Sequence, residues 1–184
     1  MESLDQQVFH FINQQMSFVW LDVLCPIARN KMTWMPFYIL GAIALIYFKK
    51  KWGLIIIVSS ILLIVATDQT SNFLKKTIQK PRPCATTMQV TLRVNKCSQS
   101  FAMPSAHAAN HMGLAVFLCG VLAIRKRWKI ALLCWAFFIA FSQIYVGLHF
   151  PSDVLVGMLL GTAWGFIFYK SIIKQKEKIW QQNL

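Results

Sequence analysis

The stretch GLIIIVSSILLIVA, residues 53–66, contains no charged residue and decides the class of fold. It continues with mixed polarity to about residue 74, which approaches the roughly 20 residues that a helix needs to cross a bilayer. Four other apolar blocks resemble it, at residues 33–48, 108–124, 130–150 and 154–173. Most of the blocks are slightly short for a span, but tilt and flanking residues can extend each of them.

The composition favours a membrane protein over a soluble one. Of the 184 residues, 57% are hydrophobic and 14% are charged. A soluble bundle with five all-apolar helices would have too little remaining chain to cover them from water. We therefore expect residues 1–184 to form a single all-α domain, a polytopic membrane helical bundle with about five transmembrane helices.

Residues 1–30 differ from the apolar blocks, because apolar side chains there are interleaved with polar ones such as Gln6, Gln7 and Asn13. The segment also lacks the basic start and the continuous apolar core of a signal peptide. This pattern predicts an amphipathic helix that lies at the membrane interface. A sixth, weakly hydrophobic span through residues 8–28 is the alternative.

The basic residues indicate an orientation and a kind of partner. Nineteen Lys and Arg residues against six Asp and Glu residues give a net charge of +13. Eleven of the nineteen follow the first, third and fifth blocks, so the positive-inside rule places that face in the cytoplasm, together with the tail at residues 174–184. The loop at residues 75–107 is then extracytoplasmic. The charge suits the lipid bilayer and a phosphorylated membrane lipid, and no compact basic domain indicates a nucleic acid.

Chain topology brings the unusual polar residues to one face. Because successive spans alternate in direction, the second and fourth spans end where the third and fifth begin. The polar residues at these ends are Lys75, Arg82, Ser105, His107, His149 and Asp153. Ionisable residues at span ends that point into a bundle indicate a functional site.

These residue types suit phosphoryl transfer without a metal. Lys75 and Arg82 carry the positive charge that a phosphate requires, and an arginine can hold two of its oxygens. A helix that begins near Ala106 offers free backbone N–H groups to an anion. Two histidines can serve as nucleophile and general acid, and an aspartate can orient an imidazole.

Three motifs occur in order across residues 75–153. They are K-x6-R-P from Lys75 to Pro83, P-S-A-H at residues 104–107, and S-Q-x5-H-x3-D from Ser142 to Asp153. Together they resemble the type 2 phosphatidic acid phosphatase superfamily, which also contains vanadium haloperoxidases and bacterial acid phosphatases. The motifs cover residues 75–153, and the expected helix order on either side agrees with the family. Three motifs in order with matching spacings are a specific signal.

The resemblance implies a role for each matching residue. His149 would attack phosphorus to form a phosphohistidine, with Asp153 orienting it. His107 would protonate the leaving group and then activate water. The phosphoryl oxygens would be bound by the remaining matching positions, which are Lys75, Arg82, Ser105, Ala106 and Gln143. No metal and no other cofactor is implied.

The implied enzyme is a lipid phosphate phosphatase that acts at the outer leaflet of a bacterial inner (cytoplasmic) membrane, from the periplasmic side. The leading substrate is undecaprenyl diphosphate. Phosphatidate, phosphatidylglycerophosphate and lipid A phosphate are close alternatives, because nothing in the motifs reads the lipid tail.

Two positions depart from the family pattern. Ala106 replaces a glycine, and Gln143 replaces an arginine that contacts phosphate in the family. The loss of that charge leaves open a catalytically weakened lipid-phosphate binder, unless Lys76, Lys80 or Arg93 compensates. A small lipid transporter is a further alternative, because Asp68 lies within a span.

Two other patterns have alternative readings. His107, His111, His149 and Asp153 could bind zinc, although Lys75 and Arg82 argue against a cation at the same place. The G-x3-G spacings at residues 157, 161 and 165 predict close packing of the fifth span inside the chain. Homodimerisation through that stripe is the alternative, and the oligomeric state stays open.

Cys84 and Cys97 differ from the other three cysteines, because both lie in the polar loop between Arg82 and the P-S-A-H motif. The expected topology places this loop on the oxidising side of the membrane, where disulfides persist. We therefore predict a Cys84–Cys97 disulfide that holds Arg82 against the site. Two free thiols are the alternative.

Overall fold

The computed structural model describes the backbone of residues 3–182 and the side chains of residues 3–175, and every regular element in this part of the chain is helical. The elements are α1 (Leu4–His10), a π-helical turn (Phe11–Gln15), α2 (Val19–Arg29), α3 (Lys31–Lys49), α4 (Lys51–Ile78), a 3-10 turn (Pro83–Ala85), α5 (Ala106–Val121), α6 (Lys126–Tyr145) and α7 (Pro151–Gln182).

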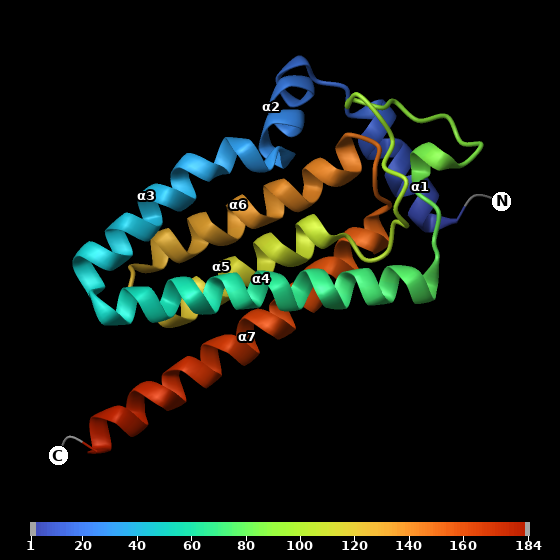
Figure 1. The fold of residues 1–184 in the computed structure, drawn as a ribbon. Coiled ribbons are helices and arrows are strands. Elements are labelled where there is room, and N and C mark those ends of the chain that lie inside the picture. The colour runs from blue at the N-terminus through green and yellow to red at the C-terminus, as the bar shows by residue number, and fades with distance from the viewer. Residues whose placement is uncertain (1–2, 183–184) are drawn as a thin grey trace.

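The five helices α3 to α7 form a bundle, and each contains all or most of one predicted apolar block (Figure 1). Helix α5 lies at its centre, in contact with α4, α6 and α7, whereas α3 packs mainly against α4. Helix α7 extends well beyond the others toward the C-terminus (Figure 1). The predicted all-α membrane bundle is therefore confirmed.

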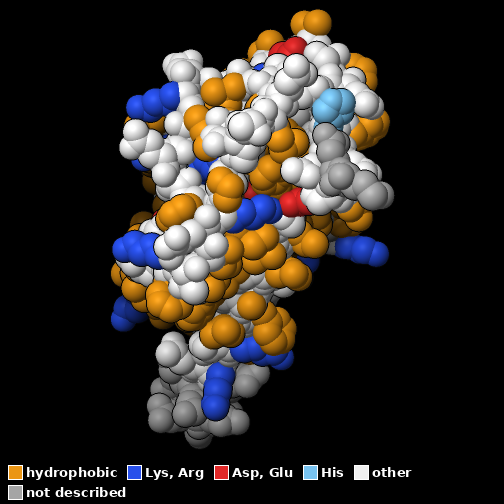
Figure 2. Space-filling view, turned by 90° about the vertical axis from the view of Figure 1, so that its right-hand side faces the viewer, with side chains coloured by type: hydrophobic (Ala, Val, Ile, Leu, Met, Phe, Trp, Pro, Cys, Tyr) orange, Lys and Arg blue, Asp and Glu red, His pale blue; other side chains and the backbone are white. Residues whose placement is uncertain are grey.

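Four of the five helices, α3, α4, α6 and α7, are long and apolar enough to cross a membrane. Helix α5 is shorter, at 16 residues, or about 24 Å at the usual rise per residue. Bulky apolar side chains on α3 point outward, for example Phe37, Ile43 and Phe48. Hydrophobic side chains cover much of the face in Figure 2, with basic side chains dispersed among them. Such a surface suits contact with lipid tails.

The N-terminal region is not one continuous helix. Helix α1 passes into the π-helical turn, and residues 16–18 separate this unit from α2. Val19, Trp20 and Val23 on α2 are exposed, while Leu21 and Cys25 pack against the end of α6. Leu4 on α1 and Phe11 in the π-helical turn are exposed as well, so both parts of the N-terminal region present apolar side chains at the surface.

The loop and the tail also have different bounds from those predicted. Helix α4 continues to Ile78, so the irregular loop covers residues 79–105 and Lys75 still belongs to the helix. Helix α7 continues through Gln182, so most of the predicted tail at 174–184 is helical, and residues 183–184 lie outside the described part.

Helices α5 and α7 meet through glycines. A Cβ atom added to Gly161 would collide with the carbonyl oxygen of Ala109, and one added to Gly165 would lie 2.5 Å from the carbonyl oxygen of Gly113. The glycine spacing of α7 therefore serves close packing within the chain, as in membrane helix pairs with small residues at their interface.

We predict that Gly161→Ala destabilises the protein, because the new methyl group forces the two backbones apart. The expected loss is about 1–3 kcal/mol, which is typical of overpacking. Gly41→Ala is the matched control, because a Cβ there meets no heavy atom within 4 Å. Thermal unfolding in detergent measures both. Equal melting temperatures for the two variants would contradict the close contact.

Candidate active site

The predicted site residues lie together at one end of the bundle. This end is formed by the last turns of α4, the first turns of α5 and α7, and the α6–α7 connection (Figure 1). The loop at residues 79–105 covers it, and helix α1 lies beside it (Figure 1). The alternation of span directions thus has the predicted consequence.

His149 and Asp153 face each other one helical turn apart. His149 Nδ1 lies 3.6 Å from Asp153 Oδ2, and the same oxygen accepts a hydrogen bond of 2.8 Å from the Phe150 amide. Both residues are buried, with Asp153 completely inaccessible to solvent. The Phe150 amide fixes the carboxylate, which in turn faces the imidazole.

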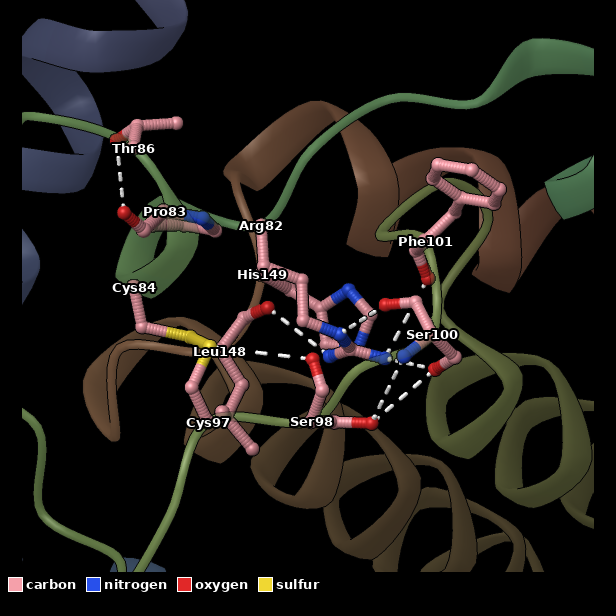
Figure 3. The surroundings of a disulfide bond; sticks show 10 residues. All are labelled: Arg82, Pro83, Cys84, Thr86, Cys97, Ser98, Ser100, Phe101, Leu148 and His149. Atoms are coloured by element: carbon pink, nitrogen blue, oxygen red, sulfur yellow. Dashed lines mark hydrogen bonds between the residues drawn. A yellow bond between two sulfur atoms is a disulfide. The ribbon is translucent and has the colours of Figure 1, made fainter.

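Arg82 lies on the other side of the His149 ring. Its Nη1 is 3.0 Å from His149 Nε2 and donates to the Leu148 carbonyl at 3.1 Å, while its Nε donates to the Ser100 carbonyl at 2.7 Å (Figure 3). An arginine can only donate, so Nε2 accepts in this contact and the ring proton belongs on Nδ1. The neutral imidazole therefore directs its proton toward Asp153 and its lone pair toward Arg82.

Burial sets the protonation state of His149. The low-dielectric surroundings disfavour the imidazolium and lower the pKa of His149 from 6.5 to about 4. The cations Arg82 and Lys75 act in the same direction, and Asp153 opposes them. His149 is accordingly neutral at pH 7, the form in which Nε2 can act as a nucleophile.

Lys75 and His107 complete the inner part of the site. Lys75 lies in the last turn of α4, is 8% exposed, and interacts electrostatically with Arg82 and Asp153. His107, in the first turn of α5, is close enough to His149 and Lys75 for the same kind of interaction. Two histidines and two buried cations thus converge, with Asp153 as their carboxylate.

Ser105 caps α5, since its side chain accepts a hydrogen bond from the Ala108 amide. Its own amide donates to the Asp153 carbonyl at 2.9 Å, which joins the start of α5 to the start of α7. The amides of Ala106 and His107 belong to the first turn, where an α-helix provides no acceptor. The positive end of α5 is therefore directed to the same end of the bundle as His149.

Gln143 is placed differently from the other predicted ligands. Its Nε2 donates to the Ile139 carbonyl at 3.1 Å and to Ser142 Oγ at 3.0 Å, both within α6, and the residue is buried. Its main-chain carbonyl accepts from the amides of Leu148 and His149. Within residues 3–175 the amide makes no hydrogen bond to Arg82 or His149. Gln143 thus supports the α6–α7 turn, and phosphate binding by its side chain stays a prediction.

Lys80 does not replace the missing arginine. Its ammonium group donates to Asp5 Oδ2 at 2.9 Å and to Ser152 Oγ at 2.7 Å, and it lies 2.8 Å from Asp153 Oδ1. The Ser152 amide also donates to Asp5 Oδ1 at 2.8 Å. Lys80 therefore neutralises the back of the Asp153 carboxylate through an ion pair, and its hydrogen bonds go to Asp5 and Ser152.

Arg93 is also engaged elsewhere. Its guanidinium forms an ion pair with Asp22 and donates to the carbonyl oxygens of Asn13 and Tyr145. It packs 4.2 Å above the Tyr145 ring as well. This cluster attaches the loop to α2 and to the end of α6, so Arg93 has a structural use.

Cys84 and Cys97 are joined by a disulfide, with their Cα atoms 5.9 Å apart. Arg82 precedes Cys84 by two positions, and Ser98 and Ser100 follow Cys97 (Figure 3). Ser100 accepts from Arg82 with both its carbonyl and its hydroxyl oxygen, the latter at 2.9 Å. The disulfide thus joins the segment that carries Arg82 to the segment that fixes its guanidinium.

His111 and Asp68, on which the zinc-site and transporter alternatives depend, both contact other residues. Both nitrogens of His111 are occupied: Nδ1 is 2.8 Å from the His107 carbonyl and Nε2 is 3.2 Å from the Tyr38 hydroxyl. Asp68 accepts a hydrogen bond of 2.8 Å from Asn110, which fixes it between α4 and α5. In residues 3–175 no three His, Cys, Asp or Glu side chains are grouped so that they could hold a metal ion.

Sequence reasoning missed Asp5 and the contact of Lys80 with Asp153. Asp5 belongs to α1, far from the motifs in sequence, and only the folded chain brings it to Ser152. A weak signal was available, because Asp5 is one of only six acidic residues in a strongly basic chain. Such rare carboxylates tend to have partners in a membrane protein.

Comparison with known proteins identifies the family of this chain. Residues 51–177 match the family model of the PAP2 superfamily, and this segment includes all three motifs. The chain is 33% identical over 176 residues to the lipid A 4′-phosphatase of Bacteroides thetaiotaomicron, an alignment that covers 92% of this chain and 77% of that protein.

Two solved structures are similar over most of their length. The crystal structure of Aquifex aeolicus LpxE has a TM-score of 0.73 at 28% identity, covering 92% of this chain and 96% of that one. The transmembrane PAP2-type phosphatidylglycerolphosphate phosphatase of Bacillus subtilis shares the fold, with a TM-score of 0.67 at 23% identity, over 97% of this chain and 89% of that one. The family match and the motif geometry together show that this chain belongs to the PAP2 superfamily and is a multi-pass membrane phosphatase.

Proposed function

We propose that this phosphatase hydrolyses a lipid phosphate without a metal, through a phosphohistidine on His149. The alignment of Arg82, His149 and Asp153 is the observation that carries the proposal. It supports a neutral imidazole whose Nδ1 proton faces a fixed carboxylate and whose Nε2 lone pair faces a cation. An anionic phosphate would replace the imidazole as the partner of Arg82 Nη1.

In the first step, His149 Nε2 forms a bond to phosphorus as the bond to the lipid oxygen breaks. His107 gives its proton to that oxygen, so the leaving group departs as a neutral hydroxyl or as a lipid monophosphate. The imidazole of His149 becomes positively charged as it gains phosphorus, and Asp153 stabilises this charge. Lys75 and Arg82 bind the phosphoryl oxygens, on which negative charge is concentrated.

In the second step, His107 removes a proton from water, and the water oxygen bonds to phosphorus as the P–N bond breaks. Inorganic phosphate is released and His149 returns to its neutral form. Lys80 has a supporting part in both steps, because it holds one oxygen of Asp153 while the other faces His149. Lys80 and Asp5 therefore position the carboxylate without contacting the substrate.

A lipid substrate is supported by an apolar cavity of about 640 Å³ between α3, α4, α5 and α6. Tyr38 and Trp135 line it, and Tyr38 also contacts His111, whose Nδ1 is 2.8 Å from the His107 carbonyl. The cavity thus lies among the spans, and Tyr38 connects its lining to His111, which is one helical turn from His107. Such a surface accommodates part of a hydrocarbon chain.

Among lipid phosphates, we propose a lipid A phosphate ahead of undecaprenyl diphosphate, phosphatidate and phosphatidylglycerophosphate. The support is the 33% identity to a lipid A 4′-phosphatase over most of both chains. We further propose that the site faces the periplasmic side of a bacterial inner membrane. The distribution of basic residues and the Cys84–Cys97 disulfide both favour that side. The transporter alternative loses support, because Asp68 is bound to Asn110.

A phosphate-release assay on the purified protein tests this function. Lipid A, undecaprenyl diphosphate, phosphatidate and phosphatidylglycerophosphate are compared in mixed micelles that contain EDTA. We expect phosphate release from at least one of them, loss of that release in His149→Ala, and inhibition by vanadate. His10→Ala is the control, because His10 lies on α1 outside the motifs. Absence of turnover with every lipid would favour the weakened binder, and activity that requires added zinc would overturn the mechanism.

Trapping of the covalent intermediate tests the role of His107. With a 32P-labelled substrate that has a good leaving group, His107→Ala should accumulate labelled protein, because water is no longer activated efficiently. The label should be stable in alkali and labile in acid, as expected of a phosphohistidine. No label should appear in the double variant that also carries His149→Ala. Label retained by the double variant would place the nucleophile elsewhere.

Titration of His149 tests its protonation state. Its imidazole signals, followed by NMR in micelles and assigned by comparison with His149→Gln, should shift with a midpoint near pH 4. The neutral form then predominates at every pH above that value, and acidification through it removes the lone pair that attacks phosphorus. A midpoint near the ordinary value of 6.5 would show that the ring is hydrated rather than buried.

A further inference from the structure

Arg29, the last residue of α2, is a basic residue that lies beside the candidate active site but outside all three motifs. Cys25, one helical turn before Arg29 on the same face of α2, packs in one cluster with Leu148, the residue before His149. Arg29 also interacts electrostatically with His107. It acts on Arg82 in the same way. A third positive charge therefore lies near Lys75 and Arg82.

Within residues 3–175, the guanidinium of Arg29 forms no hydrogen bond or ion pair with another side chain or carbonyl group. Its Nε is buried. Burial lowers the pKa of Arg29, although an arginine stays protonated in proteins. Arg29 as a whole is only partly buried, and an anion bound next to its guanidinium would offset the cost of leaving Nε without an acceptor.

The other candidates for a compensating cation are Lys76, Lys80 and Arg93. Lys76 is exposed on the surface of α4. Lys80 holds Asp5 and Asp153, and Arg93 holds Asp22. Gln143, which occupies the position of the motif arginine, turns its amide back into α6. Arg29, by contrast, lies near His107, and its buried Nε has no hydrogen-bond acceptor.

We propose that Arg29 binds a phosphoryl oxygen of the substrate on the His107 side of the site, in place of the arginine that is absent at position 143. The inference rests on the proposed function for the identity of the anion, a lipid phosphate. It assigns α2 a part in the active site in addition to its place at the membrane interface. Lys75 then approaches the phosphoryl group from α4, Arg82 from the loop at residues 79–105, and Arg29 from α2.

Direct binding of vanadate, measured by 51V NMR on protein in micelles, tests the proposal without requiring turnover. Arg29→Gln should weaken binding about tenfold or more, the usual effect of losing a charge-assisted hydrogen bond. Arg29→Lys should weaken it less, because the charge remains while the fork of donors is lost. Lys31→Gln is the matched control: it removes one exposed charge two positions away and should leave binding within about twofold of the wild type.

A second variant tests the replacement itself. Adding Gln143→Arg to Arg29→Gln should restore much of the vanadate affinity, because the motif cation returns. Unchanged vanadate affinity in Arg29→Gln, with or without a lower melting temperature, would overturn the proposal and assign Arg29 to the end of α2 alone. Normal vanadate binding by a wild-type protein that hydrolyses no lipid would reject the proposed reaction while leaving the anion site, and the role of Arg29 in it, intact.

Discussion

The close contact between α5 and α7 is the constraint on which the site depends. Glycines on α7 allow its backbone to approach the carbonyl oxygens of α5. At the active-site end of this contact, the Ser105 amide donates a hydrogen bond to the Asp153 carbonyl. Helices in a bilayer gain little from burying apolar surface against one another, so tight packing and hydrogen bonds must hold them. His107 begins one of these helices and Asp153 the other. The distance between the two halves of the catalytic machinery is therefore set by backbone contact rather than by flexible side chains.

Several charged groups of the site are buried, and each is stabilised by different contacts. Asp153 is shared between the Phe150 amide, Lys80 and His149. Arg82 is bound by carbonyl oxygens. His149 is neutral, so its burial does not require the desolvation of a charged imidazole. What remains is an excess of positive charge at the mouth of an apolar bundle, which favours an anion that arrives attached to a lipid.

Much of this architecture could be predicted from the sequence, and the limits have a physical origin. Five helices could be predicted from the apolar blocks, because a helix in contact with lipid requires a long uninterrupted run of hydrophobic residues. The residues of the three motifs could be located because their local spacing places them on adjacent helix ends. The partners of Lys80 and Arg93 could not be predicted, because Asp5 and Asp22 lie more than 70 positions away in sequence. The same is true of Gln143, whose rotamer depends on how α6 packs, and of the break between α1 and α2.

The network around Lys80 has a consequence for how the protein is made. Asp5 and Ser152, which it brings together, are 147 positions apart in the chain, with Lys80 near the middle. Contacts of such long range form only after the intervening segments are in place, and loop closure makes them late events in folding. Asp5 of α1 can therefore bind Ser152 and Lys80 only after α7 has formed. Until then Asp153 has only its local contact with the Phe150 amide, so the complete network around this carboxylate forms when the last helix is in place.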